Sequence, residues 1–233
     1  MSNWNFWSIL VFIIAILIIS PVLAIFYSAF SGNTELWPHL FSTVLPKYTI
    51  NTFILMFGVG SLSLFFGVST AWIITRYDFP IKTFLEWALL LPAAIPAYII
   101  AYTYTDILEY AGPIQGLLRD FFGWKNAKDY WFPNIRSMGG AIFVMSSVLY
   151  PYIFLMARAS FISTPLSYYH TSMLHGKNVF FNVALPLARP SIVAGLALVL
   201  METISDFGTV DYFAIETLTL GVFNVWLGMN SLS

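Results

Sequence analysis

The sequence contains no cysteine and very little charge. The absence of cysteine excludes disulfides and thiolate metal sites. Only 9% of the 233 residues are Asp, Glu, Lys or Arg, whereas about 25% is usual in soluble domains. Because 59% are hydrophobic, the chain cannot cover a water-facing surface, and we predict an integral membrane protein surrounded by lipid. The net charge of -1 gives no reason to expect nucleic acid as a partner.

The sequence also lacks recognisable catalytic motifs. Gly176-Lys177 has neither the upstream glycine nor the hydroxyl residue of a phosphate-binding loop. None of the three histidines, His39, His170 and His175, adjoins a plausible nucleophile or metal-ligand cluster. The five-residue spacing of His170 and His175 puts them on different sides of a helix, so metal ligation is not expected. We therefore expect neither an enzyme nor a cofactor.

The sequence contains several long apolar runs. Each run is long enough to cross ~30 Å of hydrocarbon as a helix, and none shows the alternating pattern of lipid-facing strands. We predict an all-α, polytopic transmembrane helical bundle, with residues 1–233 forming a single transmembrane domain. The first run is expected to be a retained span, since residues 1–6 carry no Lys or Arg. The five expected spans are approximately Trp7 to Phe30, Thr52 to Thr75, Phe84 to Leu108, Met138 to Ser160, and Ile192 to Tyr212.

Small residues and prolines mark features inside these spans. The second span contains small residues that allow a neighbouring helix to approach closely. In the third, Pro92 and Pro96 each remove a backbone hydrogen bond and predict a kink, and Pro151 is expected to kink the fourth. Bent helices can line a translocation path. Proline is common in membrane helices, however, so these prolines alone are weak evidence for one.

A polar stretch from Phe161 to Ser191 separates the last two apolar runs. Thr164, followed by Pro165, predicts a capped helix start. Gly176 allows a backbone bend, and prolines at the end of the stretch are expected to break the chain before the next span. About thirty residues exceed what a connector needs, so we predict a docking surface consisting of two short helices joined at the glycine.

Charge alone does not orient the protein. Cytoplasmic loops are usually marked by an excess of Lys and Arg, but here the two sides of the membrane have equal numbers of these residues. One side has Arg76, Lys82, Arg158, Lys177 and Arg189, and the other has Lys47, Arg119, Lys125, Lys128 and Arg136.

Several segments together resemble a known family. LPLARP at Leu185 to Pro190, starting nine residues after Gly176, resembles the second half of the cytoplasmic "EAA" loop of permease subunits in binding-protein-dependent ABC importers. Further segments resemble the ferric-iron permease type in the same order along nearly the whole chain. These are NTFILMFGVG, TRYDFP, EWALLLP, YTDILEYAGP, YWFPNIRS, LYPYIFLMARASF and ALVLMETISDFGTVDYF.

The resemblance implies a division of labour between subunits. In this family the loop inserts as a coupling helix into a cytoplasmic ATPase dimer, whose closure rocks the membrane helices between inward-open and outward-open states. It places residues 161–190 in the cytoplasm and Ser31 to Asn51 outside a bacterial inner membrane. It also implies a periplasmic substrate-binding protein and a second permease half as partners. The docking-loop residues that it indicates are His170, Thr171, Ser172, Gly176, Leu185 and Pro186.

One departure from the family pattern concerns the docking contact. His170-Thr171-Ser172 stands where the family usually has Glu-Ala-Ala, six residues before the glycine. A histidine is neutral or positive near neutral pH, so it can reverse an ionic contact made by glutamate. The alternative is that His170 and His175 are ordinary interfacial residues.

Carboxylates near the end of the fifth predicted span form a second candidate site. If Arg189 lies at the membrane interface, Glu202 is ~20 Å and Asp206 ~26 Å along the helix. A carboxylate inside a membrane is costly and usually faces a bundle interior, a cavity or a partner. We predict that Glu202 and Asp206, with Thr209 nearby, face a subunit interface or translocation path. The alternative is a structural carboxylate bonded to a neighbouring helix.

The sequence thus predicts a permease that moves ferric iron delivered by a binding protein. Permeases for thiamine, polyamine or phosphonate are the alternative substrates. A non-transporting, truncated fragment is the other alternative, because permeases of this type usually fuse two halves and this chain stops before a sixth span.

Overall fold

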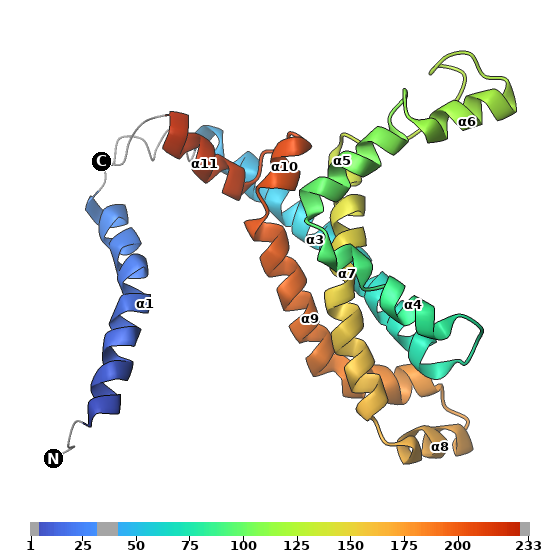
Figure 1. Cartoon of the computed structure of the whole chain (residues 1–233), viewed down its shortest axis with the longest axis horizontal. Coiled ribbons are helices and arrows are strands. Elements are labelled where there is room, and N and C mark those ends of the chain that lie inside the picture. The colour runs from blue at the N-terminus through green and yellow to red at the C-terminus, as the bar shows by residue number, and fades with distance from the viewer. Residues whose placement is uncertain (1–4, 32–41, 229–233) are drawn as a thin grey trace. The chain divides into compact units, whose positions relative to one another are not determined.

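The computed structural model describes residues 5–31 and 42–228, and within those residues the regular structure is helical throughout. Figure 1 labels the α-helices. The chain also contains a 3₁₀ turn, η1, between α4 and α5, and a π-helical turn, η2, between α8 and α9. In chain order they are α1 (Phe6–Ser31), α3 (Leu45–Arg76), α4 (Lys82–Ala88), η1 (Leu91–Ala94), α5 (Ala97–Leu108), α6 (Pro113–Phe122), α7 (Met138–Ser163), α8 (Leu166–Leu174), η2 (Phe180–Ala184), α9 (Leu185–Ser205), α10 (Gly208–Tyr212) and α11 (Leu218–Gly228).

Four of the described helices are long and apolar enough to cross a membrane, and a bent helix pair raises the number to five if it forms one span. The predicted all-α membrane fold is therefore confirmed, and the chain is a multi-pass membrane protein. The four are Phe6–Tyr27, Leu45–Arg76, Met138–Ser163 and Phe180–Ser205. The polar connection predicted from Ser31 to Asn51 is shorter than expected, because α3 already begins at Leu45; its residues 32–41 lie outside the described part.

The chain divides into two compact units, residues 47–221 and residues 1–46 with 222–233. In the second of these, α1 is apolar on all sides, and its described side chains are exposed almost throughout. A helix with this composition is typical of a membrane span surrounded by lipid.

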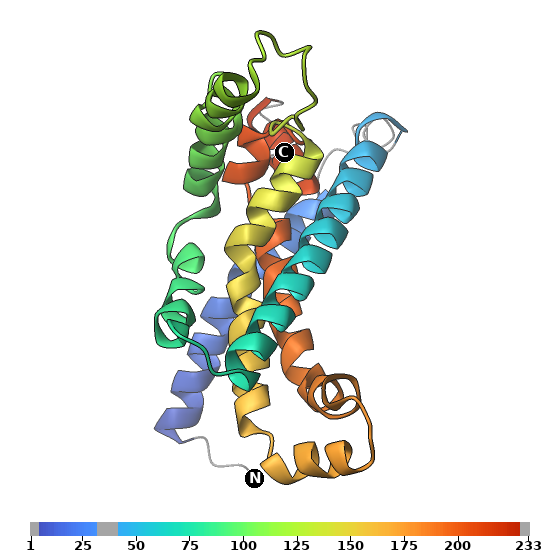
Figure 2. The same cartoon turned by 90° about the vertical axis from the view of Figure 1, so that its right-hand side faces the viewer.

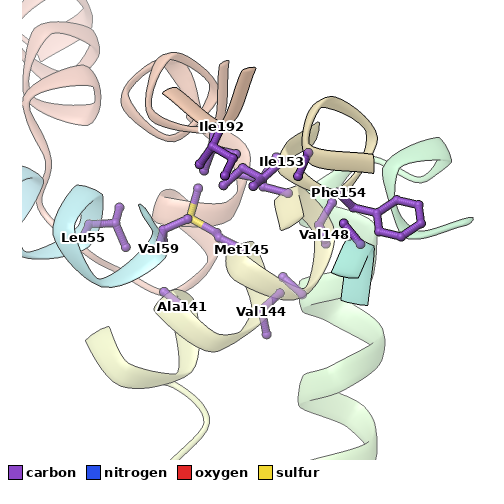
Figure 3. Packing of buried hydrophobic residues seen from close by; sticks show 14 of the residues in the cluster. Leu55, Val59, Ala141, Val144, Met145, Val148, Ile153, Phe154 and Ile192 are labelled. Atoms are coloured by element: carbon purple, nitrogen blue, oxygen red, sulfur yellow. The ribbon is translucent and has the colours of Figure 1, made fainter. Parts of the chain in front are cut away.

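The core of the 47–221 unit lies between α3, α7 and α9. Figure 3 shows its apolar side chains, including Val59 of α3, Met145 and Ile153 of α7, and Ile192 of α9. Ile153 fits against two glycines, since a Cβ atom at Gly67 would lie 2.8 Å from its Cβ and one at Gly195 would lie 2.9 Å from its Cα. The small residues thus act as predicted, allowing close helix packing.

The third predicted span is broken rather than kinked. Lys82–Ala94 and Ala97–Phe122 meet at an angle of 102°. Pro92 lies in the first turn of η1 and Pro96 immediately precedes α5, so neither proline supplies a hydrogen-bond donor where the two helices would join. The kink predicted at Pro92 and Pro96 is thus a break between two helices instead of a bend within one. By contrast, α7 continues through the buried Pro151.

The fifth predicted span is displaced toward the N-terminus. We expected Leu185-Pro186 and Pro190 to interrupt the chain, but α9 begins at Leu185 and continues through Pro190. Pro186 has no N–H to donate to the turn before it, and that turn, Phe180–Ala184, is π-helical instead of α-helical. The helix ends at Ser205, because Asp206 adopts an extended backbone with ψ of 125°. The prediction that the span continues through residues 206–212 was therefore wrong.

Candidate functional site

An aromatic cluster holds the predicted docking loop against α3 and α7. Trp72 of α3 contacts Phe161 of α7, Tyr169 of α8 and Phe180 of η2, with ring centroids 5.5, 6.4 and 5.1 Å away. The Tyr169 hydroxyl also donates to the Phe161 carbonyl at 3.2 Å. Figure 2 shows α8 at the end of the 47–221 unit where α3 and α7 end. A displacement of α8 would therefore reach α3, α7 and the start of α9 through packed rings.

The start of α8 differs from the prediction. Thr164 does not cap it, because the Thr164 hydroxyl donates to the Ser160 carbonyl of the preceding helix at 3.0 Å. Pro165 is the N-terminal flanking residue instead of the first helical one, and no side chain caps α8. The predicted cap was wrong because threonine can satisfy its hydroxyl on the helix behind it as well as on the helix ahead.

The end of α8 confirms the bend predicted at Gly176. This glycine has a φ of +62°, in the left-handed region where residues with a Cβ atom are strained. Its N–H donates to the Met173 carbonyl and the Lys177 N–H to the Ser172 carbonyl, both at 3.0 Å. These are the two bonds of a Schellman motif, which reverses the chain after α8.

The second predicted short helix is a π-helical turn that runs directly into α9. Asn178 caps it, because its side-chain oxygen accepts the backbone N–H groups of Phe180 at 3.0 Å and Phe181 at 3.2 Å. Sequence reasoning missed Asn178, although asparagine after a glycine bend is a known helix-start signal. It also missed Trp72 and Tyr169, whose roles depend on contacts between distant segments.

The predicted docking residues fall on two surfaces. His170 and Thr171 are exposed on α8, whereas Ser172 is buried on its inner side and directs its hydroxyl to the Lys177 carbonyl at 3.4 Å. Leu185 and Pro186 are half-buried at the start of α9, next to η2. Between α8 and η2 lies a recess of about 510 Å³. It is lined by Ser167, Tyr168, Thr171, Ser172, His175, Lys177, Asn182 and Val183.

The carboxylates on the same end of the unit are paired within the chain. Asp78 accepts from Lys82 at 2.9 Å, and this contact lowers the pKa of Asp78 below its usual value. Glu86 of α4 pairs with Arg158 of α7 at 3.0 Å. The recess itself is lined by no carboxylate. Its charged lining is Lys177, with His175 beside it.

In the second predicted site, the structure joins Asp206 to Thr209 but does not join Glu202 to either. Glu202 is exposed in the last turn of α9, and within the described residues its side chain contacts no partner. Asp206 uses both carboxylate oxygens to start α10, accepting from the Thr209 N–H at 2.8 Å and the Thr209 hydroxyl at 3.0 Å. Because α9 ends before Asp206, the expected common helix face with Glu202 does not form. Thr209 is fully buried.

In comparison with known proteins, the chain is similar to transport permeases. No family model matches it. It is 27% identical over 154 residues to the molybdenum transport system permease protein ModB of Escherichia coli (strain K12), covering 65% of this chain and 64% of that protein. The chain therefore spans less than two thirds of the length of that relative.

Two further relatives are named for other substrates, sulfate and ferric iron. The probable sulfate transport system permease protein cysT of Chlorokybus atmophyticus is 25% identical over 211 residues, 88% of this chain and 70% of that protein. The Fe(3+)-transport system permease protein FbpB 2 of Haemophilus influenzae (strain ATCC 51907 / DSM 11121 / KW20 / Rd) is 25% identical over 225 residues, 94% of this chain and 39% of that protein. All three relatives are transport system permeases by name, and their names do not agree on one substrate.

Proposed function

We propose that this chain, whose relatives are permeases of binding-protein-dependent ABC transporters, is the membrane subunit of an ATP-driven importer in a bacterial inner membrane. The observation that carries the proposal is the α8 loop, an ordered surface helix fixed to three helices through Trp72. ATP hydrolysis then belongs to a cytoplasmic ATPase dimer. A periplasmic binding protein supplies substrate, and a second permease half completes the pathway.

The geometry suggests how ATPase motion reaches the membrane. Closure of the ATPase dimer pushes on α8, which is too short to absorb the movement by bending. The Trp72 cluster passes the movement to α3, α7 and η2, and η2 continues without interruption into α9. Packed cores respond to such shifts by moving as units, which allows helices to change between two arrangements.

Ferric iron is the substrate that we propose. The match to the Fe(3+)-transport permease extends over 94% of this chain, against 88% for the sulfate permease and 65% for the molybdenum permease. After Arg189 the sequence contains no Lys or Arg but four carboxylates, of which Glu216 pairs with Lys47 at 2.6 Å and Asp206 binds Thr209, leaving Glu202 and Asp211. This segment suits a cation better than an oxyanion, which needs basic partners.

Glu202 is the residue that we place on the translocation path or the subunit interface. It is exposed and unpaired in the described structure, while Asp206 and Thr209 shape the turn behind it. We expect Glu202→Gln to lower uptake about 10-fold or more while leaving complex assembly intact, since it removes a charge near the path and changes little in shape. Asp120→Asn, on the exposed side of α6, is the control. Uptake equal in both variants would remove Glu202 from the path.

The function is tested with the purified complex of full-length permease, ATPase and binding protein in proteoliposomes. We expect ATP-dependent uptake of radioactive ferric iron and no uptake of molybdate or sulfate. Uptake of either oxyanion instead would keep the permease function and overturn the substrate. A chain that associates with no ATPase would show the fragment alternative to be correct.

A further inference from the structure

At the end of the 47–221 unit where α8 lies, the charged side chains that form no ion pair within the described residues are basic. Both of its described carboxylates, Asp78 and Glu86, are already paired with cations of the same chain. Several basic or potentially basic side chains there form no ion pair in the described part of the structure. They are Arg76, His170, His175, Lys177 and Arg189.

The outward side of α8 combines apolar side chains with one of these groups. Tyr169 and Ser172 are buried, whereas positions 166, 170, 173 and 174 lie together on one exposed face of α8. Leu166 and Met173 are exposed there, and the Leu174 side chain is 87% exposed. His170 lies between them. A water-facing helix rarely presents this much apolar surface without a partner.

The recess beside α8 adds a site for a single charged group. Lys177 and His175 line it, and the Nδ1 atom of His175 is 2.8 Å from the Thr171 carbonyl. The hydroxyl groups of Ser167 and Thr171 complete a polar lining without any carboxylate. A carboxylate entering from a partner would find an ammonium group in the recess and no competing acid.

We propose that the ATPase surface that receives α8 is an apolar groove with an acidic rim, and that one carboxylate of this rim enters the recess to contact Lys177. Leu166, Met173 and Leu174 fill the groove, and His170 faces the rest of the rim. This inference rests on the proposed function and specifies the charge of its partner. Opposite charges across an interface select partners and speed encounter more than they add affinity. An ATPase that recognises a glutamate at the His170 position would therefore be a poor partner for this chain.

The contact can be observed with a zero-length carbodiimide, which joins an amine to a carboxylate only when the two touch. In the full complex with its ATPase, we expect a cross-link between Lys177 and an Asp or Glu of the ATPase, located by mass spectrometry. Lys177→Arg is the matched variant, because it keeps the charge but cannot form the amide. It should lose the cross-link and keep ATPase binding.

Charge reversal tests the same contact by affinity. We expect the double variant His170→Glu and Lys177→Glu to bind the ATPase about 10-fold more weakly at low salt, with a smaller difference at high salt because ions screen the contact. Lys128→Glu, at the other end of the unit, is the control and should bind normally. Leu174→Ser serves as the apolar probe of the same surface.

Each outcome separates the two proposals. Weaker binding by the double variant together with the Lys177 cross-link supports the acidic partner. If Leu174→Ser weakens binding but the double variant does not, α8 docks on the ATPase and the acidic rim is wrong. If none of these α8 variants affects binding, α8 is not the docking element and the proposed function fails with it.

Discussion

Gly176 shows how one residue determines the shape of the proposed docking loop. Its positive φ allows the two bonds that end α8 and turn the chain toward η2. No other heavy atom would touch a Cβ at this position, so a side chain there is opposed by the backbone conformation alone. The effect of a substitution can therefore be attributed to the turn.

We expect Gly176→Ala to cost about 1 kcal/mol locally, because alanine is strained in the left-handed region. The loop should loosen, and ATPase binding should weaken. Gly123 is the matched control, since it has a φ of +71° and equally open surroundings in a different loop. Gly123→Ala should show similar backbone strain with normal ATPase binding, measured by co-purification and thermal unfolding. Equal binding loss in both would contradict the local role of Gly176.

Asp129 makes the loop after α6 sensitive to acid. Its carboxylate accepts the backbone N–H groups of Asn126 at 2.9 Å and Lys125 at 2.8 Å, and these bonds lower the pKa of Asp129 below the usual 3.8. A lowered pKa means that the charged form is favoured in the folded loop. The stabilisation is therefore present above about pH 4 and is lost as the pH falls through the folded value.

We expect the 123–134 segment to exchange its amide hydrogens faster at about pH 3 than at pH 6, after correction for intrinsic rates. Asp129→Asn should exchange quickly at both values, because it lacks the charge that strengthens the two bonds. Hydrogen exchange with mass spectrometry measures this. A pH dependence that persists in Asp129→Asn would assign the effect to another group.

At the scale of elements, α7 and α9 approach each other through small residues. The Cα of Ile153 lies 2.9 Å and the Tyr152 carbonyl oxygen 3.2 Å from where a Cβ of Gly195 would be. Because backbone atoms form this contact, the helices must move apart to admit a side chain. The prolines act at the same scale, since Pro92 and Pro96 divide one predicted helix into two elements at 102°.

We expect Gly195→Leu to lower stability by about 1–3 kcal/mol through overpacking. Ala197→Leu is the control on the same helix, because Ala197 is exposed. Thermal unfolding of the purified protein in detergent should show a clear loss for Gly195→Leu and little change for Ala197→Leu. An equal effect of the two would mean that the glycine is not needed for the approach of α7 and α9.

At the scale of the whole molecule, Trp72 connects the docking loop to the membrane helices. Its ring contacts aromatic side chains of α7, α8 and η2 while belonging to α3. Transport by an importer needs a rigid path from the ATPase to the spans, since a movement absorbed by loose packing is not transmitted.

We expect Trp72→Ala to uncouple the transporter. Removing the indole opens a cavity where four elements meet, so α8 should move without carrying α3 and α9 along. ATP hydrolysis should continue in the assembled complex while uptake per ATP falls several-fold. Trp87→Ala is the control, because Trp87 lies on α4 with 72% of its surface exposed. Reconstituted complexes measure both rates, and an unchanged ratio in Trp72→Ala would contradict this coupling route.

The sequence by itself determined the features that depend on neighbouring residues. Apolar runs specify membrane helices because each residue contributes its own transfer free energy. The bounds of α1 were therefore predicted to within one residue and those of α7 to within three. The Gly176 bend was predictable for the same reason, since left-handed backbone is a local preference. The resemblance of LPLARP to a family loop likewise depends on a continuous segment.

Only the tertiary structure decided what depends on distant residues. Pro92 and Pro96 predicted a disturbance of the helix, and the structure shows that it is a full break with an angle of 102°. Asp206 ended α9 by capping α10, so its predicted alignment with Glu202 was lost. The Trp72 cluster and the Glu86–Arg158 pair join segments more than 70 residues apart. Such contacts decide which charges remain free around α8, because a side chain is available to a partner only if the fold leaves it unpaired.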